Sequence, residues 1–280
     1  MFRLSILSAA AALFVCLLLV GCVTSPRVGV CQHTHGSPDE SAHGQYYFVV
    51  PPAPKQEDGT SDPLDDRMIV IEDEKFTLTY PAWFTRRVPL EVILKHIDDS
   101  FKRVEALLGK FDRRVEIFVP GSITADGLPE GLMILGLCWM DDGQIKVAVS
   151  LPAARVIDTF AHELLHARLR DLGVQPPRWF EEGMAHMLES EDGFNADLFQ
   201  LLEQVGMMTN EELEAAARGI TSDEMRLRAT GWAIAYYLVH VRNTPLKDVA
   251  TSSEFPDLDE VWKAVSEAAK LRDVLARLAA

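Results

Sequence analysis

The chain has 280 residues, of which 48% are hydrophobic and 25% are charged, a composition typical of a globular protein with one or two cored domains. Collagen-like, coiled-coil and fully disordered chains are excluded. Its 42 acidic residues outnumber 27 basic ones, which gives a formal net charge of −15. Because binding to a phosphate backbone depends on clustered Lys and Arg, this charge argues against nucleic acid as a partner.

An uncharged apolar run over residues 4–20 follows a single basic residue, Arg3. Such a run is typical of a secretory signal or a short transmembrane helix. Residues 19–22, Leu-Val-Gly-Cys, resemble the bacterial lipobox, in which small residues precede a cysteine that becomes lipidated. We expect residues 1–21 to be a lipoprotein signal peptide and Cys22 to carry the lipid, with an uncleaved membrane anchor as the alternative. Both predict a cell-envelope location on an extracytoplasmic membrane surface, such as the periplasmic face of an outer membrane.

Residues 22–66 are rich in Pro, Ser, Gly, Asp and His, with one apolar patch at 46–50, and predict a mostly flexible tether. Besides Cys22, the tether contains one cysteine and three histidines: Cys31, His33, His35 and His43. This group could bind a soft divalent metal or simply belong to a solvated linker of biased composition. Outside the cytoplasm Cys31 could also pair with Cys138, with two unpaired thiols as the alternative.

The folded domain is expected over residues 67–280. It begins with β-branched and aromatic residues that predict strand structure over 68–80. Apolar residues at helical spacing then predict a helix over 89–108, which Gly109 would end.

Three further strands are predicted at residues 115–119, 131–140 and 144–150, and the Asp141-Asp142-Gly143 turn indicates that the last two form a hairpin. Past residue 152 the periodicity is helical almost to the end of the chain. The pattern therefore predicts an α+β fold, in which a small mixed or antiparallel sheet is followed by a helical half.

Residues 162–166 read His-Glu-Leu-Leu-His inside a predicted helix. Residues four apart lie on one helix face, so His162 and His166 can reach one Zn²⁺ ion. Glu163 lies roughly 100° around the helix, where it can address a metal-bound water without being a ligand.

A solvated helix face with two histidines is the alternative interpretation of this motif. Against it, the flanking residues are largely apolar: Ile157, Phe160, Ala161, Leu164, Leu165 and Leu169. They predict a buried helix, in which polar groups without partners would cost about 1–3 kcal/mol each, and a bound metal would remove that cost.

Residues 177–186 read Pro-Arg-Trp-Phe-Glu-Glu-Gly-Met-Ala-His. Together with the H-E-x-x-H motif, their W-x-x-E-G pattern resembles the gluzincin zinc metallopeptidases, in particular the bacterial peptidase-MA-like group. The resemblance covers approximately residues 110–245 and implies a thermolysin-like catalytic core. Carried over by position, it implies that His162, His166 and Glu182 are the zinc ligands and that Glu163 is the general base.

Two positions depart from the pattern of the family. Thermolysin-like relatives have a carboxylate four residues after the ligand glutamate, where this chain has His186, which could orient a metal ligand or be a partly exposed helix histidine. Similar proteins also tend to have an aromatic residue near Arg228 that stabilises the oxyanion. Here Tyr236 and Tyr237 are the candidate donors, with helix packing as their alternative role.

The resemblance implies a zinc protease, a hydrolase that cleaves polypeptide internally through a zinc-bound water activated by Glu163. The lipobox-like segment predicts that the lipid on Cys22 anchors this protease to a membrane. We expect the substrate to pair with an edge strand, for which residues 144–150 are the candidate. A weak or inactive gluzincin-fold lipoprotein that serves as a binding or assembly module is the main alternative, and a hydrolase acting on another amide is a further one. Nothing in the sequence indicates an oligomeric state.

Overall fold

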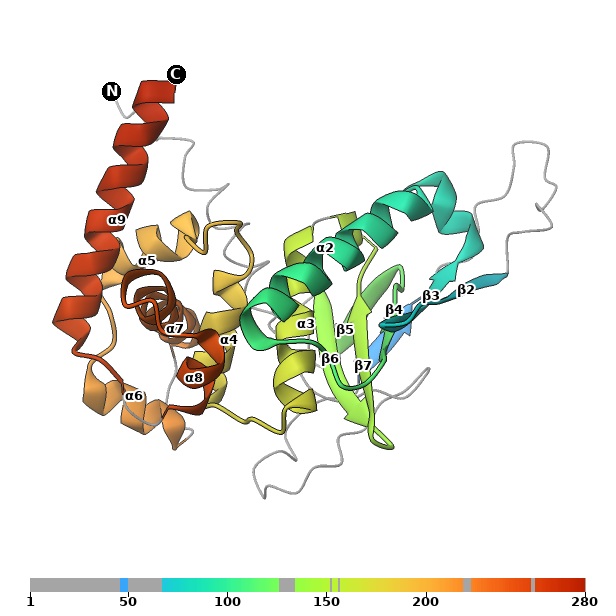
Figure 1. Cartoon of the computed structure of the whole chain (residues 1–280), viewed down its shortest axis with the longest axis horizontal. Coiled ribbons are helices and arrows are strands. Elements are labelled where there is room, and N and C mark those ends of the chain that lie inside the picture. Colours follow the sequence, from blue (N-terminus) through green and yellow to red (C-terminus); the bar gives the residue numbers. More distant parts are fainter. Residues whose placement is uncertain are drawn as a thin grey trace, which may run out of the picture. The chain divides into compact units, whose positions relative to one another are not determined.

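The computed structural model describes residues 46–49, 67–125, 134–151, 153–155, 157–218, 223–252 and 255–279. They form an α+β fold in which a mixed five-stranded sheet is followed along the chain by a helical half, as predicted (Figure 1). The described residues divide into two compact units, one within 46–98 and 112–163 and the other within 99–111 and 164–279.

The strands of the described chain belong to the first unit and are β1 (Tyr46–Val49), β2 (Met68–Glu72), β3 (Phe76–Pro81), β4 (Val115–Phe118), β5 (Ser122–Ala125), β6 (Gly136–Asp141) and β7 (Gln144–Val149). Five of them form a sheet of order β2-β3-β4-β7-β6, and β1 pairs with β5 in a separate two-stranded sheet. The β2–β3 and β6–β7 pairs are antiparallel, whereas β3–β4 and β4–β7 are parallel. The sheet is therefore mixed.

Helix α2 (Leu90–Leu108) connects the parallel strands β3 and β4, which need a crossover because parallel neighbours cannot be joined by a tight turn. A short 3₁₀ segment, η2 (Ala82–Arg86), precedes it. The helix confirms the predicted apolar face, since its residues at spacings of three and four are buried: Ile93, Ile97, Phe101, Val104 and Leu108. Gly109 follows with a φ of +78°, so it ends the helix in the left-handed conformation that glycine adopts without strain.

The predicted hairpin is confirmed by β6 and β7, which are joined by Asp142 (φ +49°) and Gly143 (φ +77°). Two central residues with positive φ define a turn whose twist matches that of antiparallel strands. The prediction that 144–150 is an edge strand is wrong. Strand β7 lies between β4 and β6 because it also pairs in parallel with β4, so that β6 lies at the end of the strand order.

Much of the N-terminal prediction falls on residues that the structure does not describe, including the signal peptide (residues 1–21), Cys22, Cys31 and the histidines beside it. Within the predicted tether, strand β1 pairs antiparallel with β5. Cys138 is buried in β6, and its pairing with Cys31 stays a prediction. Of the helices in the described ranges, none has both the length and the hydropathy needed to cross a membrane.

The second unit is helical. After η3 (Ala153–Arg155) and α3 (Ile157–Asp171), the chain forms α4 (Arg178–Met187), α5 (Ala196–Val205), α6 (Asn210–Ala217), α7 (Glu224–Tyr236), the π-helical segment η4 (Tyr237–Val241), α8 (Leu246–Thr251) and α9 (Leu258–Ala279). Every residue of α7 from Leu227 to Ala235 is buried. A helix buried on all sides is typical of the centre of a bundle, and α7 lies among the other helices of this unit in Figure 1.

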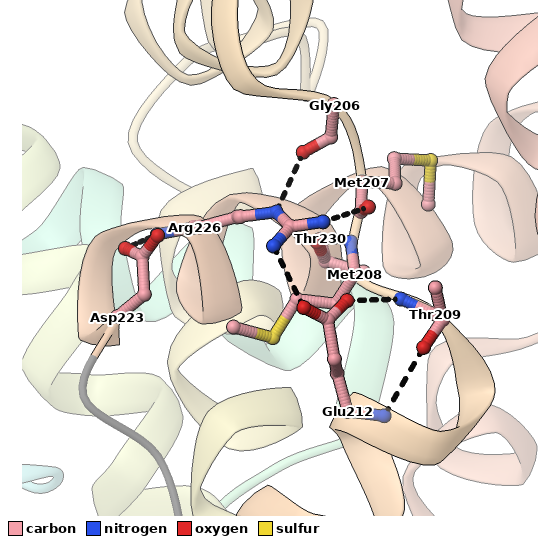
Figure 2. Close-up of polar contacts among 8 residues, drawn as sticks. All are labelled: Gly206, Met207, Met208, Thr209, Glu212, Asp223, Arg226 and Thr230. Atoms are coloured by element: carbon pink, nitrogen blue, oxygen red, sulfur yellow. Dashed lines mark hydrogen bonds and ion pairs between the residues drawn. The ribbon is translucent and has the colours of Figure 1, made fainter.

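The start of α7 is fixed by a network of hydrogen bonds around Arg226 (Figure 2). The Asp223 side chain caps the helix by accepting from the Arg226 amide. The Arg226 guanidinium donates to the carbonyls of Gly206 and Met207 and to the Glu212 carboxylate. The hydrogen bond from the Thr209 amide, together with Arg226, lowers the pKa of Glu212. Arg226 thus has an oxygen partner for each of its donor nitrogens and attaches the loop before α6 to α7.

Candidate metal centre

Helix α3 carries the two histidines of the H-E-x-x-H motif. His162 and His166 are one turn apart, and only 6% and 1% of their surfaces are exposed. Their apolar neighbours Phe160, Leu164 and Leu165 are fully buried, which confirms the prediction of a buried helix. Two imidazoles are therefore held on one face of a rigid element and away from water.

Helix α4 supplies the third residue of the cluster. The chain leaves α3 at Gly173, which has a φ of +67°, and α4 begins after Pro177. This turn brings Glu182, which is 2% exposed, to the two histidines. One potential ligand atom from each of His162, His166 and Glu182 lies within 4.8 Å of the others. Two imidazole nitrogens and one carboxylate oxygen are a donor set suited to a divalent cation, so this buried cluster could hold a metal ion.

A second group of residues that could hold a metal ion shares His162 with the first. It consists of His162, His186 and Glu189, again with ligand atoms within 4.8 Å of one another. The Nδ1 atom of His186 lies 2.8 Å from a carboxylate oxygen of Glu189. His186 is thus buried on α4 and faces a carboxylate, so the alternative of a partly exposed helix histidine is wrong, while its role in orienting a metal ligand stays a prediction.

Glu181 is a residue of the site that the sequence interpretation missed. Its carboxylate lies 2.5 Å from Nδ1 of His166 and 3.3 Å from the guanidinium of Arg170. Burial by itself would raise the pKa of Glu181, but the hydrogen bond and the charge of His166, together with Arg170, hold that pKa below its usual value. An ionised carboxylate on Nδ1 orients the imidazole and turns its other nitrogen, Nε2, toward a metal bound at the cluster. Glu181 is therefore placed to fix the orientation of the His166 ring.

Replacing Glu181 with glutamine should weaken metal binding by about 10- to 100-fold, because a neutral amide does not increase the basicity of the His166 imidazole. Competition with a chromogenic chelator measures the affinity. Glu214→Gln, on the exposed side of α6, is the matched control and should bind metal as the wild type does. Equal affinities for wild type and Glu181→Gln would show that the Glu181–His166 contact does not support the metal.

Glu163 is 2% exposed, and it has room because β6 begins with a glycine. A Cβ atom on Gly136 would lie 2.4 Å from Oε1 of Glu163 and 2.7 Å from two of its side-chain carbons. The glutamate carboxylate thus occupies the space that any larger residue at position 136 would take. Glu163 therefore projects from α3 against the backbone of Gly136, the first residue of β6.

Arg228 is the second residue that the sequence interpretation missed as a member of the site. It lies in the first turns of α7, is buried, and places Nη1 3.6 Å from Oε2 of Glu182. No local signal in the sequence marks it, because the contact depends on how α7 packs against α4. The structure therefore adds a buried cation to the carboxylate of the candidate metal cluster.

The two tyrosines considered as oxyanion donors have other neighbours. The Tyr237 hydroxyl donates to Glu260 and accepts from Arg242. Tyr236 packs against Trp232 and Phe194 and stacks on His240 with the ring centroids 4.9 Å apart, and burial raises the pKa of its hydroxyl. The contacts of both tyrosines thus fit the alternative that they pack within the helical unit. Their role as oxyanion donors stays a prediction.

Comparison of the chain with protein-family models, curated proteins and solved structures finds no match.

Proposed function

We propose that the chain is a zinc-dependent peptidase of the gluzincin type that hydrolyses polypeptide at the cell envelope, to which the lipid on Cys22 attaches it. The buried cluster of His162, His166 and Glu182 carries this proposal, because its donor atoms lie within 4.8 Å of one another and a carboxylate outside the cluster, Glu163, follows directly in the helix. The donor set is that of zinc hydrolases with two histidines and one glutamate.

The three cluster residues would hold Zn²⁺, which as a Lewis acid polarises the scissile carbonyl and makes water easier to deprotonate. Glu163 accepts the proton of the attacking water and delivers it to the nitrogen of the leaving amine. Burial of Glu163 favours this role, since a carboxylate away from bulk water returns its proton to the substrate rather than to solvent. His166 is oriented by Glu181.

The substrate would bind as an extended strand along β6. This strand lies at the end of the sheet order, and its first residue, Gly136, is the one that touches Glu163. Pairing with main-chain groups gives affinity with little dependence on side chains, which suits unfolded or extended polypeptide. The net charge of −15 favours neutral and basic segments over acidic ones.

Glu163→Gln tests this function. The variant should bind zinc as the wild type does, because Glu163 is not one of the cluster residues, but its cleavage of a carboxymethylated, unfolded protein should fall by about 10²- to 10⁴-fold. Zinc is measured by atomic emission and cleavage by gel electrophoresis, with the surface variant Glu214→Gln as the control.

Equal zinc and equal cleavage in wild type and Glu163→Gln would rule out the proposed mechanism. If the zinc-loaded wild type cleaves nothing, the domain is the binding module that the sequence left as an alternative.

A further inference from the structure

Arg228 is a buried cation that is only loosely paired. Its side chain is 4% exposed, yet its two ion pairs are longer than hydrogen bonds: Nη1 lies 3.6 Å from Glu182, and Nε lies 3.8 Å from Glu224. The Glu224 side chain is 53% exposed and is therefore partly solvated. Burying a guanidinium is costly unless its donors are bound to acceptors, so an arrangement this loose calls for a reason.

Two of the donor atoms of Arg228 make no hydrogen bond. Both Nε and Nη1 are buried, and neither has a hydrogen-bond partner. The other arginine at the start of α7 shows the contrast, since all the donor nitrogens of Arg226 have oxygen acceptors (Figure 2). Arg226 is thus a structural cation, whereas Arg228 has donors available for an oxygen atom that the protein itself does not supply.

The position of Arg228 relative to Glu182 is fixed by direct contact between α4 and α7. A Cβ atom on Gly183 would lie 2.2 Å from the carbonyl carbon of Gly231, and one on Gly231 would lie 2.5 Å from the backbone oxygen of Trp179. The two helices therefore touch through their backbones at the turn that carries Glu182. The backbone of Arg228 is therefore fixed relative to Glu182, which limits how far its guanidinium must reorganise when charge develops beside it.

We infer that Arg228 forms an anion-binding subsite beside the metal cluster, and that it takes the oxygen that becomes negative at the scissile carbonyl. This inference rests on the proposed function. As the water oxygen bonds to the carbonyl carbon, the π electron pair of the carbonyl moves to its oxygen, and Arg228 donates hydrogen bonds to that oxygen without giving up a proton. When the C–N bond breaks, the electron pair returns to form the carbonyl, and the amine leaves with the proton from Glu163.

The subsite explains how the chain can lack an aromatic donor at the start of α7. A guanidinium carries a full positive charge and two parallel N–H groups, so it stabilises an anionic oxygen at least as well as a phenol does. Tyr237 is then left to its contacts with Glu260 and Arg242, and Tyr236 to its aromatic neighbours.

The test uses the zinc-loaded full chain and a peptide phosphonate, in which a tetrahedral anionic group replaces the scissile amide. In Arg228→Met, both the affinity for the phosphonate, measured by calorimetry, and kcat should fall by roughly 10²- to 10³-fold, with KM for the peptide nearly unchanged. Arg228→Lys should recover part of both losses because it keeps the charge. Arg226→Lys, on the same helix, is the matched control and should bind the phosphonate as the wild type does.

Phosphonate affinity and kcat that are unchanged in a folded, zinc-loaded Arg228→Met would overturn the inference and leave Arg228 as a counter-ion of Glu182. If Arg228→Met loses zinc, the Arg228→Lys variant tests the inference instead. Lysine keeps the charge but lacks the paired N–H donors of the guanidinium, so phosphonate binding should still be weakened at least tenfold. Failure of the proposed function is recognised separately. If the wild type cleaves nothing but binds the phosphonate through Arg228, the anion-binding subsite is supported and the proposed peptidase function is refuted.

Discussion

Glu182→Gln is expected to remove zinc from the protein, whereas Glu189→Gln should leave it bound. His162 belongs to both groups of residues that could hold a metal, so the two glutamates distinguish them. The affinity of Glu182→Gln should fall by more than about 100-fold, the upper range for residues that only orient a ligand. Zinc retention after dialysis measures the difference. The opposite result, zinc lost from Glu189→Gln alone, would assign the metal to His162, His186 and Glu189.

Glu182→Gln should also destabilise the metal-free protein. Glu182 lies 3.6 Å from Arg228 and both are buried, so a neutral amide leaves the guanidinium without its buried counter-charge. Such a loss costs about 3–5 kcal/mol of the free energy of unfolding, measured in urea with a chelator present. Adding Arg228→Met to Glu182→Gln removes the unpaired charge and should restore part of the stability but none of the zinc binding. A double variant no more stable than Glu182→Gln would refute the coupling.

Gly183→Ala should lower the free energy of unfolding by about 3 kcal/mol, although alanine is the better helix former by about 1 kcal/mol. The reason is the 2.2 Å separation between the added Cβ and the backbone of Gly231, since backbone atoms cannot move aside as a flexible side chain can. The helices α4 and α7 would be forced apart, and Glu182 would move with α4. Zinc affinity should therefore fall together with stability.

Gly206→Ala is the control for this substitution. Gly206 has a φ of +76° and a ψ of 163°, a region essentially restricted to glycine, and nothing lies within 4 Å of an added Cβ, so only the backbone strain of about 1–3 kcal/mol applies and zinc binding should not change. Urea unfolding and the chelator assay measure both variants. A Gly183→Ala protein as stable as the wild type would mean that α4 and α7 are not in backbone contact.

Local signals in the sequence were sufficient to predict most elements of the fold. The helix over 89–108 follows from apolar residues three and four apart, and the hairpin turn follows from an Asp-Gly pair that tolerates positive φ. The order of the strands could not be predicted from local signals, because the pairing of Val115 with Ile145 joins segments that are far apart in the sequence. The apolar run Val147–Val149 did carry a signal, since strands buried on both faces are typical of the interior of a sheet with parallel strands.

The residues of the candidate site also differ in whether the sequence could predict them. The candidate ligands His162 and His166 follow from helix geometry, because residues four apart share a face. Glu182 lies on another helix and was implied by the family resemblance instead. Glu181 and Arg228 could not be predicted from motif spacing. Each acts on a residue of another helix, His166 or Glu182, and the contact exists only once α3, α4 and α7 are packed.

Under the proposed function, the glycine at the start of β6 makes the acid–base role of Glu163 depend on a residue outside the H-E-x-x-H motif. A chain with both motifs intact but alanine or a larger residue at position 136 would keep its metal ligands and displace Glu163, since even a Cβ there comes within 2.4 Å of the carboxylate. Among sequences that share the two motifs, a glycine at this strand position should therefore separate hydrolases from chains that only bind the metal. The motifs by themselves cannot make that distinction.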